Sequence, residues 1–174
     1  MKIKEIKRAL AVGIVLLFFS SQSVNAQKND VPEKLYDLQR AVNAVRVARK
    51  AGVVGDPFID KIQRGTQEYL RCVKDHKERE NFYTISTMYS DILLIYAEVA
   101  LVDEYSHKPH AYLHNTLDLS EIVDKYDLPT ELVPGTDYRR VKAEASSKIL
   151  QVASDKLDRA NDLVLHYKSD GAVN

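Results

Sequence analysis

Three of the five histidines in the chain lie within eight residues of one another, next to two carboxylates. The histidines are His107, His110 and His114, and the carboxylates are Asp103 and Glu104. Zinc, copper and nickel accept imidazole and carboxylate ligands. The spacing matches no established metal motif such as HExxH, and Pro109 disrupts the helical geometry that would bring His110 and His114 together. Two interpretations therefore stay open: a metal site at His107, His110 and His114, or a solvated loop that follows a helix.

A single carboxylate, Glu98, interrupts the most apolar internal segment of the chain. Neighbours such as Leu94 and Leu101 would desolvate it and make it a proton donor or a ligand, as a hydrolase would require. Because buried charges are avoided unless they are paired, the competing interpretation is a structural one. Glu98 then shares a narrow polar line with Asp91 or pairs with a lysine of a neighbouring helix. Lys142 would lie at a similar height if the two long helices run antiparallel.

Other catalytic and cofactor patterns are missing from the sequence. It contains no GxSxG, no HExxH and no Walker lysine, and Cys72 has no identifiable base. The lack of CxxCH excludes covalent haem, and Met88 is more typical of a core position than of a haem ligand. Cys72, the only cysteine, cannot form an internal disulfide, and we interpret it as a small residue beside a buried stripe. We therefore expect no cofactor and no enzymatic activity.

The segment 81–105 must position Glu98, and its periodicity predicts a helix. One stripe has alternating spacings of three and four and comprises Phe82, Ile85, Tyr89, Ile92, Tyr96 and Val99. A second line has a spacing of seven and comprises Thr84, Asp91, Glu98 and Tyr105. A helix that is apolar nearly all round is usually covered by neighbours. Glu98 leaves the uninterrupted apolar run too short for a bilayer, so we predict a core helix.

The first 26 residues are typical of a secretory signal peptide. A basic start is followed by an apolar core at 9–19 and by Val24-Asn25-Ala26, small residues that signal peptidase accepts. This segment carries four basic residues and one acidic residue, so the remainder has 21 basic and 24 acidic residues and a net charge of −3. We expect a periplasmic or secreted domain at 27–174 with no stable membrane span. The charge argues against nucleic acid as a partner.

The remaining periodic segments predict three more main helices and a short one. A helix at 33–51 has an inner stripe of Leu35, Leu38, Val42 and Val45, and a helix from Asp56 to about 77 buries Phe58, Ile62, Thr66, Tyr69 and Val73. Gly65 allows a close helix approach, and the charged run 75–80 is a turn. A short helix is expected at 117–126. The longest helix begins at Thr136 or Asp137, ends near 168, and faces inward with Val141, Ala145, Ile149, Val152, Ala160, Leu163 and Tyr167. Lys156 also falls on this inner stripe. The predicted fold is all-α, a four-helix up-down-type bundle with an extra short helix between helices three and four.

The connection 106–136 is long for a link between helices, and such segments are often functional or cover another surface. One interpretation is that its leucines cover Leu94 and Leu101. The other is a partner-binding surface, because tyrosine is enriched at interfaces. The residues of that surface would be Leu94, Leu101, Tyr105, Tyr112, Leu117 and Tyr126. The leading hypothesis is an exported, non-enzymatic interaction protein such as an inhibitor, immunity-type or adaptor protein. The alternative is a metal- or cofactor-binding bundle that uses the three clustered histidines.

Overall fold

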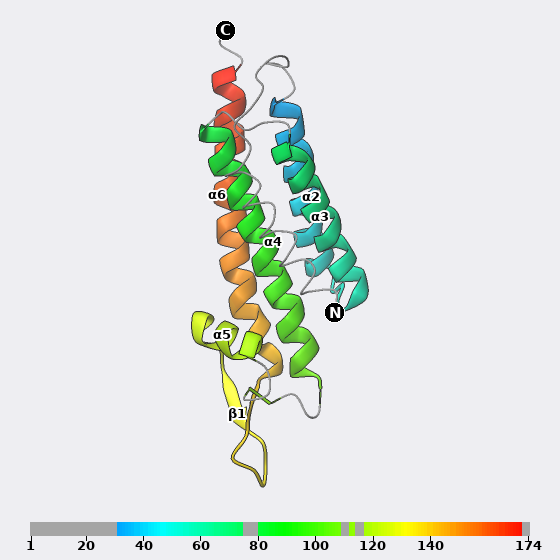
Figure 1. Cartoon of the computed structure of the whole chain (residues 1–174), viewed down its shortest axis with the longest axis vertical. Coiled ribbons are helices and arrows are strands. Elements are labelled where there is room, and N and C mark those ends of the chain that lie inside the picture. Colours follow the sequence, from blue (N-terminus) through cyan, green and yellow to red (C-terminus); the bar gives the residue numbers. More distant parts are fainter. Residues whose placement is uncertain (1–30, 75–79, 109–111, 114–116, 172–174) are drawn as a thin grey trace.

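A computed structural model describes residues 31–74, 80–108, 112–113 and 117–171 of the chain. Four long helices dominate it: α2 (Val31–Lys50), α3 (Asp56–Lys74), α4 (Glu80–Ser106) and α6 (Ser146–Gly171). In Figure 1, α4 runs down the molecule with α6 on one side and with α2 and α3 on the other. The predicted all-α class is confirmed. The predicted signal peptide and most of the predicted turn at 75–80 lie outside the described residues.

The two middle helices of the arrangement are α2 and α4. Helix α4 packs against α2, α3 and α6, while α2 packs against α3, α4 and α6. The other two long helices, α3 and α6, lie on opposite flanks of this central pair. The finer prediction of a regular four-helix up-down bundle is therefore not confirmed. The central position of α4 explains why so little of its circumference is polar.

The predicted inner faces of α2, α3 and α4 are confirmed. The buried stripe of α2 comprises Leu35, Leu38, Val42 and Val45, and that of α3 comprises Phe58, Ile62, Thr66, Tyr69 and Val73. The predicted stripe of α4 is buried along its whole length, from Phe82 to Val99. Spacings of three and four place these residues on one side of each helix, where burial of apolar surface stabilises the packed state.

Close approach of α3 to α4 depends on Gly65. A Cβ atom at this position would lie 2.6 Å from Cδ2 of Leu93, a residue that is fully buried. That separation is well below van der Waals contact, so a larger residue would force Leu93 or the helices to move. The expectation of a close helix approach at Gly65 is confirmed.

By length and composition alone, helix α4 could cross a membrane. The segment Asn81–Ser106 is long and apolar enough, although Glu98 shortens its uninterrupted apolar run. In the fold, 78% of its most apolar window is buried by the rest of the protein. A core helix of a soluble protein passes the same test of length and composition, and α4 occupies a core position.

The region 130–145 differs from the prediction. It contains an antiparallel hairpin, β1 (Thr130–Leu132) and β2 (Arg139–Val141), and a short 3₁₀ helix, η2 (Ala143–Ala145). The turn of the hairpin is closed by a hydrogen bond from the Thr136 backbone N–H to the Val133 carbonyl oxygen, 3.1 Å long. Gly135 has a φ of +77° in this turn, a backbone conformation that glycine adopts readily. Helix α6 therefore begins at Ser146, well after the predicted Thr136 or Asp137.

The side of α6 that faces the core agrees with the predicted stripe only in part: Ile149 and Ala160 are buried as predicted. The buried residues are Ile149, Ala153, Leu157, Ala160 and Val164. Predicted inner positions Lys156 and Leu163 are exposed, Leu163 to 42%, and Val152 is only half-buried. The prediction was wrong for Lys156 and Leu163, because the predicted helical phase follows from Val141, which is a buried residue of β2. Val152 still packs against the core.

Candidate interaction surface at the hairpin end

Helix α5 (Leu117–Tyr126) covers part of the polar line of α4, as one of the two interpretations of the connection expected. Its residues Leu119 and Ile122 are buried in the core, and Leu101 of α4 is only 8% exposed. Along α4, Thr84 is exposed while Glu98 is 9% exposed. The apolar residues of this side of α4 therefore belong to the core of the protein.

The Glu98 carboxylate is paired with two side chains of α5. The Lys125 ammonium donates to its two oxygens at 2.9 and 3.0 Å, and the Tyr126 hydroxyl donates to Oε2 at 2.6 Å. Burial, followed by the hydrogen bond to Glu98, raises the pKa of Tyr126 above its usual value. The Lys125 Nζ also lies 4.8 Å from the centre of the Tyr126 ring. Pairing of Glu98 with a lysine is confirmed, but the partner is Lys125 and not Lys142.

The two carboxylates predicted beside the histidines are also engaged by basic side chains. Asp103 lies 2.7 Å from Nη2 of Arg49, and both side chains are less than one-sixth exposed. Arg49 is also stacked over Phe58, 5.6 Å from the ring centre. Glu104 pairs with Lys108 one helical turn later. Arg49 therefore joins the ends of α2, α3 and α4 through Asp103 and Phe58, while the Glu104–Lys108 pair lies within the end of α4.

The predicted metal cluster can be located only in part. His107 is exposed, whereas His110 and His114 lie outside the described residues. Within the described ranges, no three histidine, cysteine or acidic side chains converge on one point. His166 lies apart from His107, on α6, with Nδ1 2.7 Å from the Asp162 carbonyl oxygen. Metal binding by the three histidines stays a prediction.

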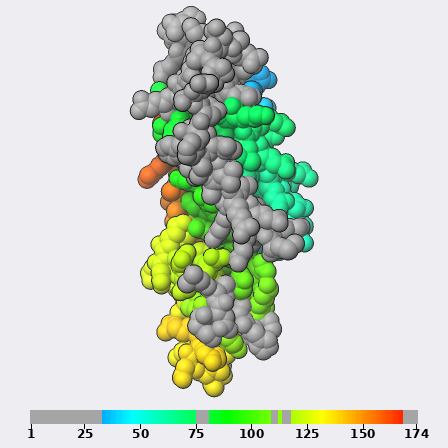
Figure 2. Space-filling model, in the orientation of Figure 1, coloured from blue at the N-terminus to red at the C-terminus, as the bar shows by residue number. Residues whose placement is uncertain are grey.

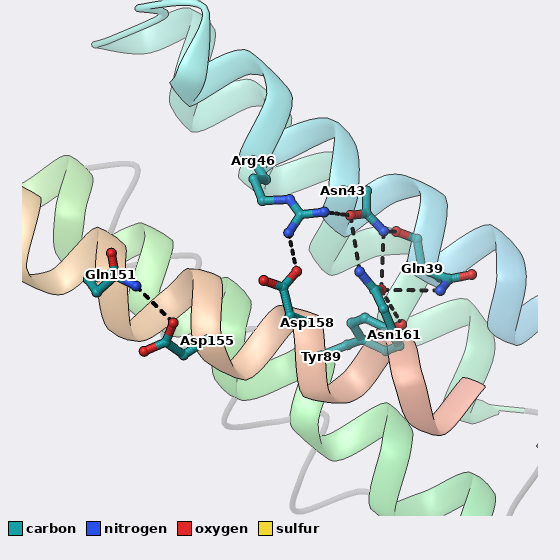
Figure 3. Close-up of polar contacts among 8 residues, drawn as sticks. All are labelled: Gln39, Asn43, Arg46, Tyr89, Gln151, Asp155, Asp158 and Asn161. Atoms are coloured by element: carbon teal, nitrogen blue, oxygen red, sulfur yellow. Dashed lines mark hydrogen bonds and ion pairs between the residues drawn. The ribbon is translucent and has the colours of Figure 1, made fainter. Parts of the chain in front are cut away.

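A second polar cluster, not predicted from the sequence, joins α2, α4 and α6 around Asn161 (Figure 3). The Asn161 Oδ1 accepts hydrogen bonds from Tyr89 Oη at 2.9 Å, Gln39 Nε2 at 3.1 Å and Asn43 Nδ2 at 3.2 Å. Burial raises the pKa of Tyr89 above its usual value. Arg46 extends the cluster by donating to Asn43 Oδ1 at 2.8 Å and by pairing with Asp158. Since these bonds connect three long helices, the cluster fixes how the helices lie against one another.

Beyond the ends of the helices, the hairpin carries exposed apolar and charged side chains. We define the hairpin surface as Tyr112, Leu113, Leu132, Asp137, Tyr138 and Arg139. Leu132 is 61% exposed and Tyr138 is 45% exposed. The rings of Tyr112 and Tyr138 lie 5.0 Å apart, and a shallow depression of about 300 Å³ is lined by Leu113, Asp137, Tyr138 and Arg139. Figure 2 shows the hairpin, in yellow, at the lower tip of the molecule.

The alternation of the strands explains why Leu132 is uncovered. Leu132 is opposite Arg139, and Thr130 is opposite Val141, so these two pairs share one face of the hairpin. Val141 is buried at the base of this face, whereas Leu132 lies further out. The Arg139 guanidinium is held on the same face by two hydrogen bonds to Thr130 Oγ1, 2.9 and 2.7 Å long. The face that packs on the protein at Val141 therefore continues outward as an apolar and cationic surface.

The predicted partner-binding residues are divided between the core and the hairpin surface. Leu101 is buried, Leu94 and Tyr105 are partly buried against the core, and the Tyr126 hydroxyl binds Glu98. Only Tyr112 belongs to the hairpin surface, and the side chain of Leu117 is not described. Sequence reasoning missed Leu132, Asp137 and Arg139. The Pro134-Gly135 pair between residues of high strand propensity is the signal that would have predicted a hairpin there.

No protein-family model, characterised protein or solved structure matched the chain in the comparisons made with it.

Proposed function

We propose that this protein is an exported, non-enzymatic interaction protein and that the hairpin surface is where it contacts another protein. The observation that supports this proposal is the contrast in burial along the connection 106–136 and the strand that follows it. Helix α5 is packed into the core through Leu119 and Ile122, while Leu132 and Tyr138 are exposed on the hairpin. Tyrosine and arginine side chains are enriched at the centre of protein interfaces.

The chemistry of the polar groups favours binding over catalysis. Glu98 is held by Lys125 and Tyr126, and Asp103 is held by Arg49. Burial raises the pKa of the Cys72 thiol to about 12, so the thiol stays protonated and a poor nucleophile at neutral pH. Glu98 and Asp103, which could serve as an acid or a base, are each held by a basic side chain. Cys72, which could serve as a nucleophile, is buried. An inhibitor, an immunity-type protein or an adaptor needs none of them to react.

The test must change the hairpin surface without opening the core. Replacing all of 106–136 by a flexible linker would delete Leu119, Ile122 and Lys125 and would leave Glu98 unpaired, so a loss of binding would have no clear meaning. The Leu132→Ser/Tyr138→Ser double variant changes only exposed side chains. A matched control is Leu165→Ser on α6, because Leu165 is 60% exposed and belongs to a different surface.

A photo-reactive amino acid at position 138 of the mature protein, used in the envelope fraction of the source cells, would identify the contacts of this surface. We expect a discrete cross-linked product that is lost when Leu132 is also changed to serine and is kept when Leu165 is changed. Cross-links of equal yield from positions 138 and 165, or none from position 138, would contradict the proposal.

A further inference from the structure

Two opposite charges lie on either side of the exposed residue Tyr138 in the sequence of the hairpin. Asp137, Tyr138 and Arg139 are consecutive, and all three line the same depression. Arg139 is hydrogen bonded to the Thr130 hydroxyl, and neither it nor Asp137 forms an ion pair within the described part of the chain. The neighbouring pair Arg140–Glu131, with an N–O distance of 2.6 Å, is by contrast already neutralised across the strands.

A negative and a positive charge on either side of one residue form a self-complementary arrangement. In a two-fold symmetric contact, a residue i of one subunit meets residue j of the other, and j meets i. When two hairpins approach with an axis through Tyr138, Asp137 of each copy faces Arg139 of the other. The contact then forms two equivalent ion pairs related by the axis, and like charges are kept apart.

The apolar residues of the hairpin surface support the same arrangement. Leu132 shares a face with Arg139 and is the most exposed large apolar residue of the hairpin, at 61%. The depression beside Tyr138 and Leu113 offers an apolar wall to a side chain of this kind. The hairpin projects beyond the ends of the long helices (Figure 1), where a second copy can approach it.

We propose that the partner of the hairpin surface is a second copy of this chain, which docks tip to tip with Asp137 of each copy against Arg139 of the other. This inference rests on the proposed function, because it names the partner of the same surface. The surface comprises six residues, whereas a standard interface has roughly 20–30 residues on each side. The dimer is therefore weak, with a dissociation constant on the order of 100 µM.

Sedimentation velocity of the mature protein, from about 10 to 500 µM and at low salt, tests the proposal by charge exchange. We expect a monomer–dimer equilibrium that Asp137→Arg and Arg139→Asp each weaken by about tenfold or more, because each places like charges in contact. The Asp137→Arg/Arg139→Asp double variant restores opposite charges across the two-fold axis and should recover most of the affinity. Asp162→Arg and Arg159→Asp, at exposed positions on α6, serve as matched controls and should leave the equilibrium unchanged.

A monomer at every concentration would overturn the proposal, and so would a dimer that responds equally to the hairpin and control variants. A far-ultraviolet circular dichroism spectrum and a melting temperature for each variant separate loss of the dimer from loss of the fold. The two proposals can fail independently. A monomer that still forms Leu132-dependent cross-links from position 138 to another protein would contradict self-association but would support the proposed function.

Discussion

Two polar clusters lie against α4 inside a largely apolar core, and they differ in charge and in the helices that they connect. Around Glu98, a buried carboxylate is bound by Lys125 and Tyr126, both from the short helix α5. Around Asn161, neutral amides and the Tyr89 hydroxyl connect three long helices. One cluster therefore holds a single surface element in place, and the other fixes the relative positions of the main helices.

The difference determines how much stability a substitution at each cluster removes and which helices lose it. A buried charge that loses its partners keeps a large desolvation penalty, whereas a neutral amide that loses one hydrogen bond keeps others. The effect of changing the Glu98 cluster should be large in free energy but confined to α5 and the hairpin. Changes at the Asn161 cluster should be smaller and spread over the whole protein.

The largest expected effect follows from removing both partners of Glu98. The Lys125→Met/Tyr126→Phe double variant should lower the free energy of unfolding by about 3 kcal/mol at pH 7. This is the lower end of the range for a buried charge left without a partner, because the Lys125 side chain is itself 53% exposed. Urea unfolding followed by circular dichroism measures the change.

A third substitution provides the control for that variant. Adding Glu98→Leu removes the unpaired charge and should restore most of the lost stability, since apolar residues often replace buried ion pairs at little cost. If the triple variant were as unstable as the double variant, lost packing rather than an unpaired carboxylate would be responsible.

At the neutral cluster, Asn161→Ala should lower the free energy of unfolding by about 2 kcal/mol, because the buried Tyr89 hydroxyl loses its acceptor. Adding Tyr89→Phe removes that unsatisfied hydroxyl. The double variant should therefore cost less than the sum of the two single changes, as a double-mutant cycle measures. Strict additivity would contradict the hydrogen bond between these residues.

The confinement of damage can be tested by amide hydrogen exchange in Glu98→Gln. The glutamine retains an acceptor for Lys125 and Tyr126 but loses the charge, so α5 should open about tenfold more often, which corresponds to roughly 1.4 kcal/mol. Protection of the core amides of α2 should stay the same. Equal loss of protection in α2 and α5 would mean that a change at the Glu98 cluster destabilises the whole protein, as expected for a change at the Asn161 cluster.

The smallest expected effect is a dependence of stability on alkaline pH that both clusters share. Tyr126 and Tyr89 have a pKa raised above 10.0 by burial in the folded state. The folded protein thus holds these protons more tightly than the unfolded chain. The stabilisation is complete below pH 10 and is lost as the pH rises beyond it, by at most about 1.4 kcal/mol per pH unit for each tyrosine. Tyr126→Phe or Tyr89→Phe should each reduce the slope of the free energy of unfolding against pH by the contribution of one proton. Urea unfolding at several pH values from 9 to 11 measures this slope.

The sequence was sufficient to predict the elements whose hydrophobic periodicity is long and regular. The inner faces of α2 and α3 and the short helix at 117–126 follow from spacings of three and four. The hairpin was missed because Thr130–Leu132 and Arg139–Val141 are only three residues long, too short for a visible alternation. Val141, buried at the base of β2, belongs to the predicted last helix, and the spacing of eleven that starts there places Leu163 wrongly on the inner face.

The sequence predicts a lysine as one possible partner of Glu98, but it does not predict which lysine. Burial of a charge requires a counter-charge, so a lysine was expected, and a lysine is present. Lys142 would lie level with Glu98 in a last helix that starts at Thr136 or Asp137, but that helix begins at Ser146. Lys125 could not be identified from periodicity, since its distance from Glu98 depends on how a non-periodic connection folds back onto α4.

The contact between Gly65 and Leu93 ties the sizes of two residues together across the seam between α3 and α4. A methyl group at position 65 requires the Leu93 side chain to move or to be smaller, or the two helices to separate, so each site restricts which substitutions the other tolerates. In a related protein, a larger residue at position 65 should be accompanied by a smaller residue at position 93. A small residue at one position and a branched residue at the other would therefore mark a related chain.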